Sequence, residues 1–268
     1  MIRFVHIMLF CGLAIFYGCN SNAHKEYRND NNQLVIEEWF NDNQLKSRIV
    51  YFNEEKTDYS ILQYDKNGNI KDSTIYVNNL PQGTRKIYDT SNDLLHIETY
   101  QNGILHGPHK AIYSSGVASF VGYQLNGNKV GEWKFFYPEG NPITYEFYDS
   151  TGRLNYFLKY EKDGHHLQSE GSGIIHVSDI MEDNGNFFID VLAAIPPNCS
   201  SILNVLLLQE GEEQILFDDE ITSIRNTIPL KTMDESNKEV RLNLSITDKK
   251  TGTSESYAVS KNISMPAL

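Results

Sequence analysis

Short apolar runs alternate with polar turns over the first 160 residues, and the aromatic residues in this pattern recur at a fixed spacing. One set is spaced by 24 or 25 residues: Phe40, Tyr64, Tyr88, Tyr113 and Tyr137. A second set follows it by 10 to 12 residues: Tyr51, Tyr76, Tyr100, Tyr123 and Tyr148. A fixed period indicates stacked copies of one small unit, each burying its apolar side against its neighbours.

The repeated unit has the composition of a β-hairpin. Runs such as 72–76 and 134–137 are rich in aromatic and β-branched residues, which favour strands. Turn pairs separate these runs: Asn67-Gly68, Asn102-Gly103, Asn126-Gly127, Thr151-Gly152 and Asp163-Gly164. Asn-Gly favours the positive φ angles of tight hairpins. The pattern predicts an extended antiparallel sheet over 28–164, with tyrosines stacking along one face.

The rhythm changes after a short polar segment, 165–172, which is expected to be a linker. Residues 240–247 alternate strictly between apolar and polar, as in a half-buried strand, and 248–252 form a turn before a return strand. About seven strands are expected over 173–268, which favours an immunoglobulin-like β-sandwich, although the Cys…Trp…Cys signature is absent. The fold class is therefore predicted to be all-β in two parts.

The first residues have the features of an export signal. Arg3 precedes an apolar stretch over 7–17, which is shorter than the roughly 20 residues of a membrane-spanning helix. Phe16-Tyr-Gly-Cys19 resembles the lipobox of bacterial lipoproteins. The resemblance implies a signal peptide over 1–18, lipid attachment at Cys19, a tether over 19–27, and a place in the cell envelope, on the periplasmic side of the outer membrane. An ordinary signal peptide or an uncleaved anchor is the alternative.

The charge of the chain limits the classes of partner, and its cysteine content limits the possible disulfides. The chain has 23 Lys and Arg against 35 Asp and Glu, and loss of Arg3 with the signal would leave 22 − 35 = −13. Such acidity disfavours nucleic acid, whose phosphates require a basic face. Only Cys199 would remain beside Cys19, so no internal disulfide is expected, and a buried thiol is the favoured interpretation of Cys199.

The candidate chemical motifs lack the residues or the spacing that a metal or catalytic site requires. His106 and His109 are three residues apart, which places them on opposite faces of a strand, and His165-His166 lie in the expected linker. The segment beginning at Asp65 lacks the glycine and glutamate that a calcium loop needs at its sixth and twelfth positions. No nucleophile context or phosphate-binding loop is found. No cofactor, metal or catalytic residue is therefore predicted.

The aromatic residues are the remaining candidates for binding. Trp133, Phe135 and Tyr137 alternate along one predicted strand and so share a face, and Tyr113 and Tyr123 hold equivalent places nearby. Packing within the repeat is the favoured interpretation. The alternative is a partly exposed platform for a glycan or a peptide, because a single-layer sheet leaves one face uncovered.

The best-formed stretches, 126–140 and 102–116, share Asn-Gly, a second glycine five residues after the Asn, and aromatic residues before another turn. They resemble the bacterial variant of the MORN repeat over about half the chain, and this resemblance implies contact rather than chemistry. We expect a membrane-anchored, non-catalytic binding or scaffolding protein with a protein or glycan partner. The alternatives are a glycan-acting hydrolase with an aromatic platform, and an antitoxin-like protein if the signal is misread.

Overall fold

The computed structural model describes residues 24–40, 43–88, 94–184, 186–209, 211–230 and 238–263. The predicted signal peptide and Cys19 lie outside these residues. Every regular element within them is a β-strand, as predicted, and all pairs of neighbouring strands are antiparallel. None of the described segments is a helix that could cross a membrane.

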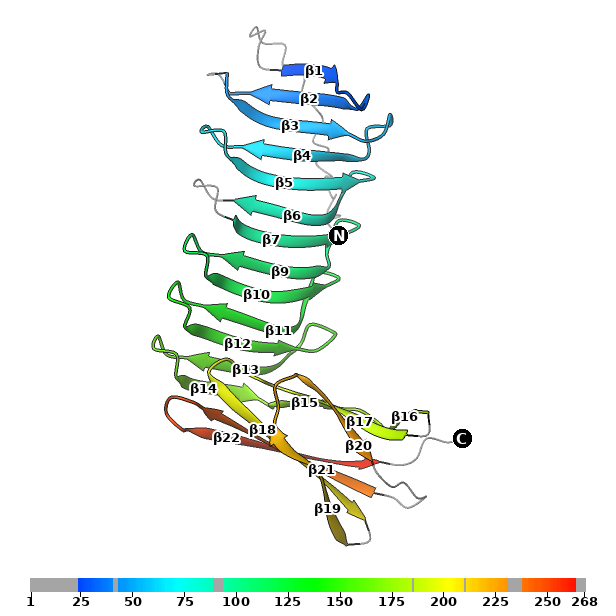
Figure 1. The fold of residues 1–268 in the computed structure, drawn as a ribbon, viewed down its shortest axis with the longest axis vertical. Helices are drawn as coiled ribbons and strands as arrows, with labels where there is room; N and C mark the ends of the chain where they lie inside the picture. The colour runs from blue at the N-terminus through cyan, green and yellow to red at the C-terminus, as the bar shows by residue number, and fades with distance from the viewer. Residues whose placement is uncertain are drawn as a thin grey trace, which may run out of the picture.

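Fourteen strands form one long sheet, stacked in chain order along the molecule (Figure 1). They are β1 (His24–Arg28), β2 (Leu34–Trp39), β3 (Leu45–Tyr51), β4 (Tyr59–Tyr64), β5 (Ile70–Val77), β6 (Leu80–Tyr88), β7 (Leu94–Gln101), β8 (Ile104–Leu105), β9 (Gly107–Ile112), β10 (Ala118–Leu125), β11 (Asn128–Phe136), β12 (Pro142–Tyr148), β13 (Leu154–Tyr160) and β14 (His166–Gly171). Each strand pairs with the next, except that the two-residue β8 pairs only with β7 and leaves β9 to continue the sheet. The predicted hairpin meander is confirmed.

The 24-residue period arises because each unit contains two strands and two turns. At one edge the first aromatic residue opens the turn: Tyr113 N–H donates to Val117 O at 2.8 Å, and Gly116, with φ of 85°, donates back to Tyr113 O. At the other edge, Asn102 and Gly103 have φ of 50° and 82°, the geometry of a tight two-residue hairpin. This turn also contacts the neighbouring hairpin, since Gly103 N–H donates to Pro81 O, at the start of β6, at 2.9 Å.

The sheet has two faces with different chemistry. Trp133 and Phe135 alternate along β11, and Phe120 of β10 lies opposite Phe135, so these rings define one face, the aromatic face. Lys134 points to the other side, which we call the lysine face because Lys86 and Lys110 share it.

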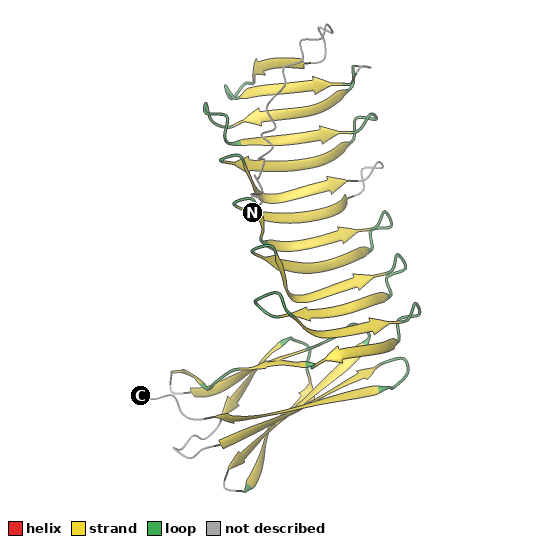
Figure 2. Ribbon diagram, turned by 180° about the vertical axis from the view of Figure 1, so that it is seen from behind, coloured by secondary structure: helices red, strands yellow, loops and turns green. Residues whose placement is uncertain are grey.

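The C-terminal part contains eight strands in two four-stranded sheets (Figure 2). The first sheet contains β15 (Ile174–Val177), β16 (Met181–Asp183), β17 (Asn186–Ala193) and β20 (Arg225–Leu230), and the second contains β18 (Cys199–Gln209), β19 (Glu212–Glu220), β21 (Lys238–Asp248) and β22 (Ser254–Ile263). Buried residues of both sheets form one hydrophobic core. The predicted alternation over 240–247 is confirmed, because Val240, Leu242, Leu244 and Ile246 are all buried.

The two parts of the chain share this core. Tyr145, Tyr156, Leu158 and Tyr160 belong to β12 and β13 of the long sheet, yet they are buried in the same cluster as the C-terminal strands. Tyr145 pairs with Lys134, so the C-terminal part covers the lysine face at this end of the sheet. The long sheet and the C-terminal part therefore fold as one continuous body at their junction.

The structure differs from the sequence expectation at 165–172. Most of this segment is strand β14, which pairs with β13 and extends the long sheet to Gly171. The polar composition of this strand is that of a linker, but its side chains have polar partners in the C-terminal part. Ser169 Oγ donates to the Glu255 carboxylate, and His166 Nε2 lies 3.1 Å from Glu255 Oε1.

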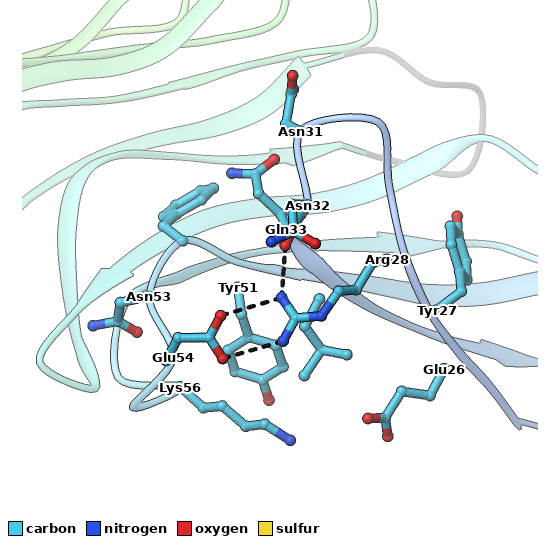
Figure 3. Close-up of a pocket in the computed structure, with 12 residues that line it drawn as sticks. Glu26, Tyr27, Arg28, Asn31, Asn32, Gln33, Tyr51, Asn53, Glu54 and Lys56 are labelled. Atoms are coloured by element: carbon cyan, nitrogen blue, oxygen red, sulfur yellow. Dashed lines mark hydrogen bonds and ion pairs between the residues drawn. The ribbon is translucent and has the colours of Figure 1, made fainter.

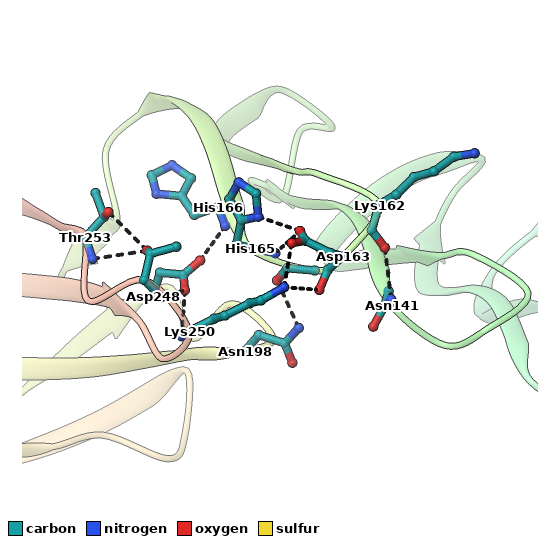
Figure 4. A network of polar contacts seen from close by, with 11 residues as sticks. Asn141, Lys162, Asp163, His165, His166, Asn198, Asp248, Lys250 and Thr253 are labelled. Carbon is teal, nitrogen blue, oxygen red and sulfur yellow. Dashed lines mark hydrogen bonds and ion pairs between the residues drawn. The ribbon is translucent and has the colours of Figure 1, made fainter.

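A hairpin turn of the C-terminal part reinforces this junction (Figure 4). The Asp248 carboxylate accepts hydrogen bonds from the backbone N–H groups of His166, of Lys250 at 2.7 Å and of Thr251 at 2.9 Å. Lys250 Nζ lies 2.5 Å from Asp163 Oδ2 in the preceding turn of the long sheet. The two parts are thus joined by polar contacts as well as by apolar packing.

Candidate binding surface

The predicted platform residues Trp133 and Phe135 belong to a ring ladder on the aromatic face. The Phe120 and Trp133 centroids lie 5.7 Å apart with planes inclined by 22°, and those of Trp133 and Phe135 lie 6.2 Å apart. His109 approaches both Phe120 and Trp133 edge-on. Lys129 Nζ lies 4.7 Å from the Trp133 centroid and 4.9 Å from that of Phe135. These are favourable aromatic and cation–π geometries.

Trp133 is a packing residue in this structure. Its side chain lies over Gly122 of the neighbouring strand, its Nε1 donates to Tyr123 O at 3.2 Å, and only 2% of the residue is exposed. A ring sealed in this way presents no surface to a ligand. The geometry supports the favoured interpretation of this residue as part of the repeat's own packing.

The other predicted platform residues do not join Trp133 in one surface. Tyr113 and Tyr137 lie at the hairpin edge, where the Tyr113 hydroxyl donates to Phe136 O at 2.8 Å. Tyr123 lies on the opposite, lysine face and is 43% exposed. Among the described residues, ring contacts between tyrosines on the aromatic face join Tyr51, Tyr59 and Tyr76, whereas His, Phe and Trp rings replace tyrosine in the middle of the sheet. Tyr145 and Tyr156 contact edge to face on the lysine face.

Several charges on the aromatic face are paired within the sheet. Arg85 lies between two carboxylates, with Nη2 at 2.5 Å from Asp72 Oδ2 and Nη1 at 3.4 Å from Glu98 Oε2. The hydrogen bond to Asp72 raises the pKa of Arg85. Lys129 is similarly paired with Glu146 at 3.2 Å. Around the ring ladder, this face is therefore a layer of ring contacts and internal ion pairs.

The lysine face has the opposite character. Asp72 and Glu98 are the only carboxylates among the described residues of β5 to β10, and both lie on the aromatic face. The lysine face of these strands instead carries Lys71, Lys86 and Lys110. In a chain of net charge −12, this is a local basic surface.

Exposed apolar side chains lie on the same face beside these lysines. Five of them are more than a third exposed: Ile75, Val77, Leu80, Ile104 and Tyr123. They cluster toward the hairpin edge that contains Asn102-Gly103. Exposed apolar residues gathered on one face are typical of a contact surface. Sequence reasoning singled out only Tyr123 among them.

A polar hollow of about 450 Å³ lies at the other end of the sheet, near β1 (Figure 3). Arg28 occupies it, with its guanidinium nitrogens 3.2 and 3.1 Å from the two Glu54 carboxylate oxygens, and Nη1 also donates to Asn32 O at 2.6 Å. These contacts pair the charges of Arg28 and Glu54 within the hollow, which therefore offers less to a ligand than the lysine face.

Two of the predicted positions, His109 and Cys199, are partly buried. His109 packs among aromatic rings, and burial lowers its pKa. Burial also raises the pKa of the Cys199 thiol to about 11. Within the described ranges, no three His, Cys, Asp or Glu side chains are arranged to hold a metal ion. No family model and no curated protein matches the chain.

Proposed function

We propose that this protein is a lipid-anchored, non-catalytic binding module of the bacterial cell envelope, attached through Cys19 and presenting the lysine face of its repeat sheet to a protein or glycan partner. The observation that carries the proposal is the continuity of this face. At β12 and β13 it already binds the C-terminal part through Tyr145 and Leu158. On the preceding strands the same face is uncovered by the described residues, and several of its apolar side chains are exposed.

The finer parts of the proposal rest on sequence. The hairpin units are of the MORN type, with Asn102-Gly103 and Asn126-Gly127 as their marker turns, and the C-terminal part is an immunoglobulin-like sandwich. The anchor would place the protein on the periplasmic side of the outer membrane. In this proposal, the protein connects the membrane to another component of the envelope.

In-cell photo-crosslinking tests the binding surface. A photoreactive residue at Ile104 or Tyr123 should capture an envelope component, whereas the same residue at Glu213 in the C-terminal part, which is also exposed, should not. Crosslinks that are equal at all three positions, or absent at Ile104 and Tyr123, would contradict the assignment. Labelled palmitate that still attaches to a Cys19→Ala variant would remove the anchor.

A further inference from the structure

Three lysines occupy the same position in successive repeat units. Lys86, Lys110 and Lys134 are spaced by 24 residues, which is the repeat period. The strand register joins them into a single row across β6, β7, β9, β10 and β11: Lys86 pairs with Ile97, Ile97 with Lys110, Lys110 with Val121, and Val121 with Lys134. Cations therefore alternate with apolar residues in a straight line along the sheet axis.

The middle of this row is electrically unsatisfied. Lys134 is paired with Glu132 at 3.1 Å, and Arg48, which lies farther along the same face, is paired with Glu37 at 2.6 Å. Lys86 and Lys110 have no carboxylate within ion-pair distance among the residues that the structure describes. Within the described residues, this row therefore has a paired cation at each end and two cations without an ion pair between them.

The geometry of the row selects a kind of ligand. Neighbouring strands are about 4.8 Å apart, so Lys86 and Lys110, two strands apart, hold their charges roughly 10 Å apart. We propose that the lysine face binds a linear anionic polysaccharide that carries one acidic group per disaccharide and lies along the row. The disaccharide of such a polymer has a length close to two strand spacings, so successive acidic groups would meet successive lysines.

Neighbouring residues suit a sugar chain as well. Ile97 and Val121 lie between the lysines, and the exposed Tyr123 ring stands beside the row, where it can contact the apolar face of a pyranose ring. The acidic strand β19 of a second copy is a poorer match. Its carboxylates follow one another along a strand at about 3.3 Å per residue, a spacing that does not repeat at that of the lysines.

The inference rests on the proposed function, because it names the partner of that surface. It is tested by calorimetric titration of the full-length protein in detergent micelles with hyaluronan oligosaccharides, which carry one carboxylate per disaccharide. Chitin oligosaccharides of equal length serve as neutral probes. We expect affinity to rise from disaccharide to tetrasaccharide, when both free lysines are engaged, and to fall at high ionic strength.

The variant Lys86→Glu/Lys110→Glu should lose affinity for the tetrasaccharide by roughly tenfold or more, because two ion pairs with the polymer become two repulsions. Lys159→Glu is the matched control: it is also an exposed strand lysine of the sheet, but it lies on the aromatic face and should bind as the unchanged protein does. Unaltered melting temperatures confirm that both variants are folded.

Four outcomes would overturn the inference: equal binding of chitin oligosaccharides, affinity independent of chain length, tetrasaccharide binding that survives the double reversal, or anionic vesicles bound as well as the polymer. Self-association abolished by the double reversal, seen by sedimentation, would assign the surface to a second copy instead. A protein partner crosslinked from Ile104 would still support the proposed function if the polysaccharide failed to bind. Failure of this inference is therefore distinguishable from failure of the proposed function.

Discussion

Gly122 lies directly against the indole of Trp133, so that a Cβ atom added to Gly122 would come within 2.2 Å of Trp133 Cδ2. No flexible side-chain end is available to move aside, because the clash is with the fused ring system itself. The indole also contacts Phe120, Phe135 and Lys129, and these neighbours hold it in place. The absence of a side chain at Gly122 is therefore what allows Trp133 to lie flat in the sheet.

Gly122→Ala should destabilise the protein by about 1–3 kcal/mol, because overpacking forces the ring from its position. Urea unfolding measures the free energy. In a Trp39→Phe background, which leaves Trp133 as the single tryptophan, the native fluorescence should shift to longer wavelength as the ring gains solvent. Ser119→Ala, on the same strand, is the control and should leave both readings nearly unchanged. A stable variant with an unshifted spectrum would show that Trp133 is not held as described.

Arg85 should be a larger determinant of stability than the adjacent Lys86. Its guanidinium bridges Asp72 and Glu98, whose side chains are only 13% and 17% exposed, whereas Lys86 is exposed and unpaired within the described residues. Arg85→Ala leaves two largely buried carboxylates without their cation, and we expect a loss of about 1–3 kcal/mol. Lys86→Ala should change the free energy of unfolding by less than about 0.5 kcal/mol.

A compensating variant separates charge from packing. Combining Arg85→Met with Asp72→Asn and Glu98→Gln removes the cation and both anions while keeping much of the side-chain volume. This triple variant should recover much of the stability lost in Arg85→Ala, as measured by urea unfolding. If it is as unstable as the single variant, then packing of the arginine stem, not its charge, is what matters.

Features that depend on neighbouring residues in the sequence could be predicted, and features that depend on distant contacts could not. The hairpin meander could be predicted because turn pairs such as Asn102-Gly103 and the recurring aromatic residues encode local geometry. Strand β14 could not, because His166 and Ser169 find their partners, Asp248 and Glu255, more than 80 residues away. A linker and a strand with distant polar partners have the same composition.

The candidate site was harder to predict because it depends on register. Alternation correctly placed Trp133 and Phe135 on one face, but the face of Tyr123, on the neighbouring strand, depends on Val121, which shares its face and pairs with Lys134. Tyr123 consequently lies on the opposite face from Trp133. The 24-residue spacing of Lys86 and Lys110 is visible in the sequence, but the lack of carboxylates around them appears only when the strands are paired.

Cys199 should react slowly with thiol reagents in the folded protein. Burial raises its pKa to about 11, so the nucleophilic thiolate is a small fraction near neutral pH. In a variant with Cys11→Ser and Cys19→Ser, Cys199 is the only thiol, and its reaction with a chromogenic disulfide can be followed alone. Urea should accelerate the reaction by at least about tenfold, since the unfolded thiol has a pKa near 8.5. Equal rates would show that the thiol is accessible.

The turn contacts between the long sheet and the C-terminal part should weaken in acid. The hydrogen bond from Lys250 is the main cause that lowers the pKa of Asp163, to about 2. Burial alone would raise the pKa of Asp248, but hydrogen bonds from the backbone of His166, Thr251 and Lys250 outweigh it and lower that pKa too.

Because these folded-state pKa values lie below the unfolded value of about 3.9, their contribution to stability is fully present above about pH 4 and is lost as the pH falls toward 2. Lys250→Met should lower the melting temperature at neutral pH, and the gap from the unchanged protein should close in that window. Lys249→Met, whose Nζ lies 3.9 Å from exposed Glu220, is the control and should change melting little at either pH. A gap that persists unchanged at pH 2 would mean that Lys250 stabilises the junction by packing, not through the ionised Asp163.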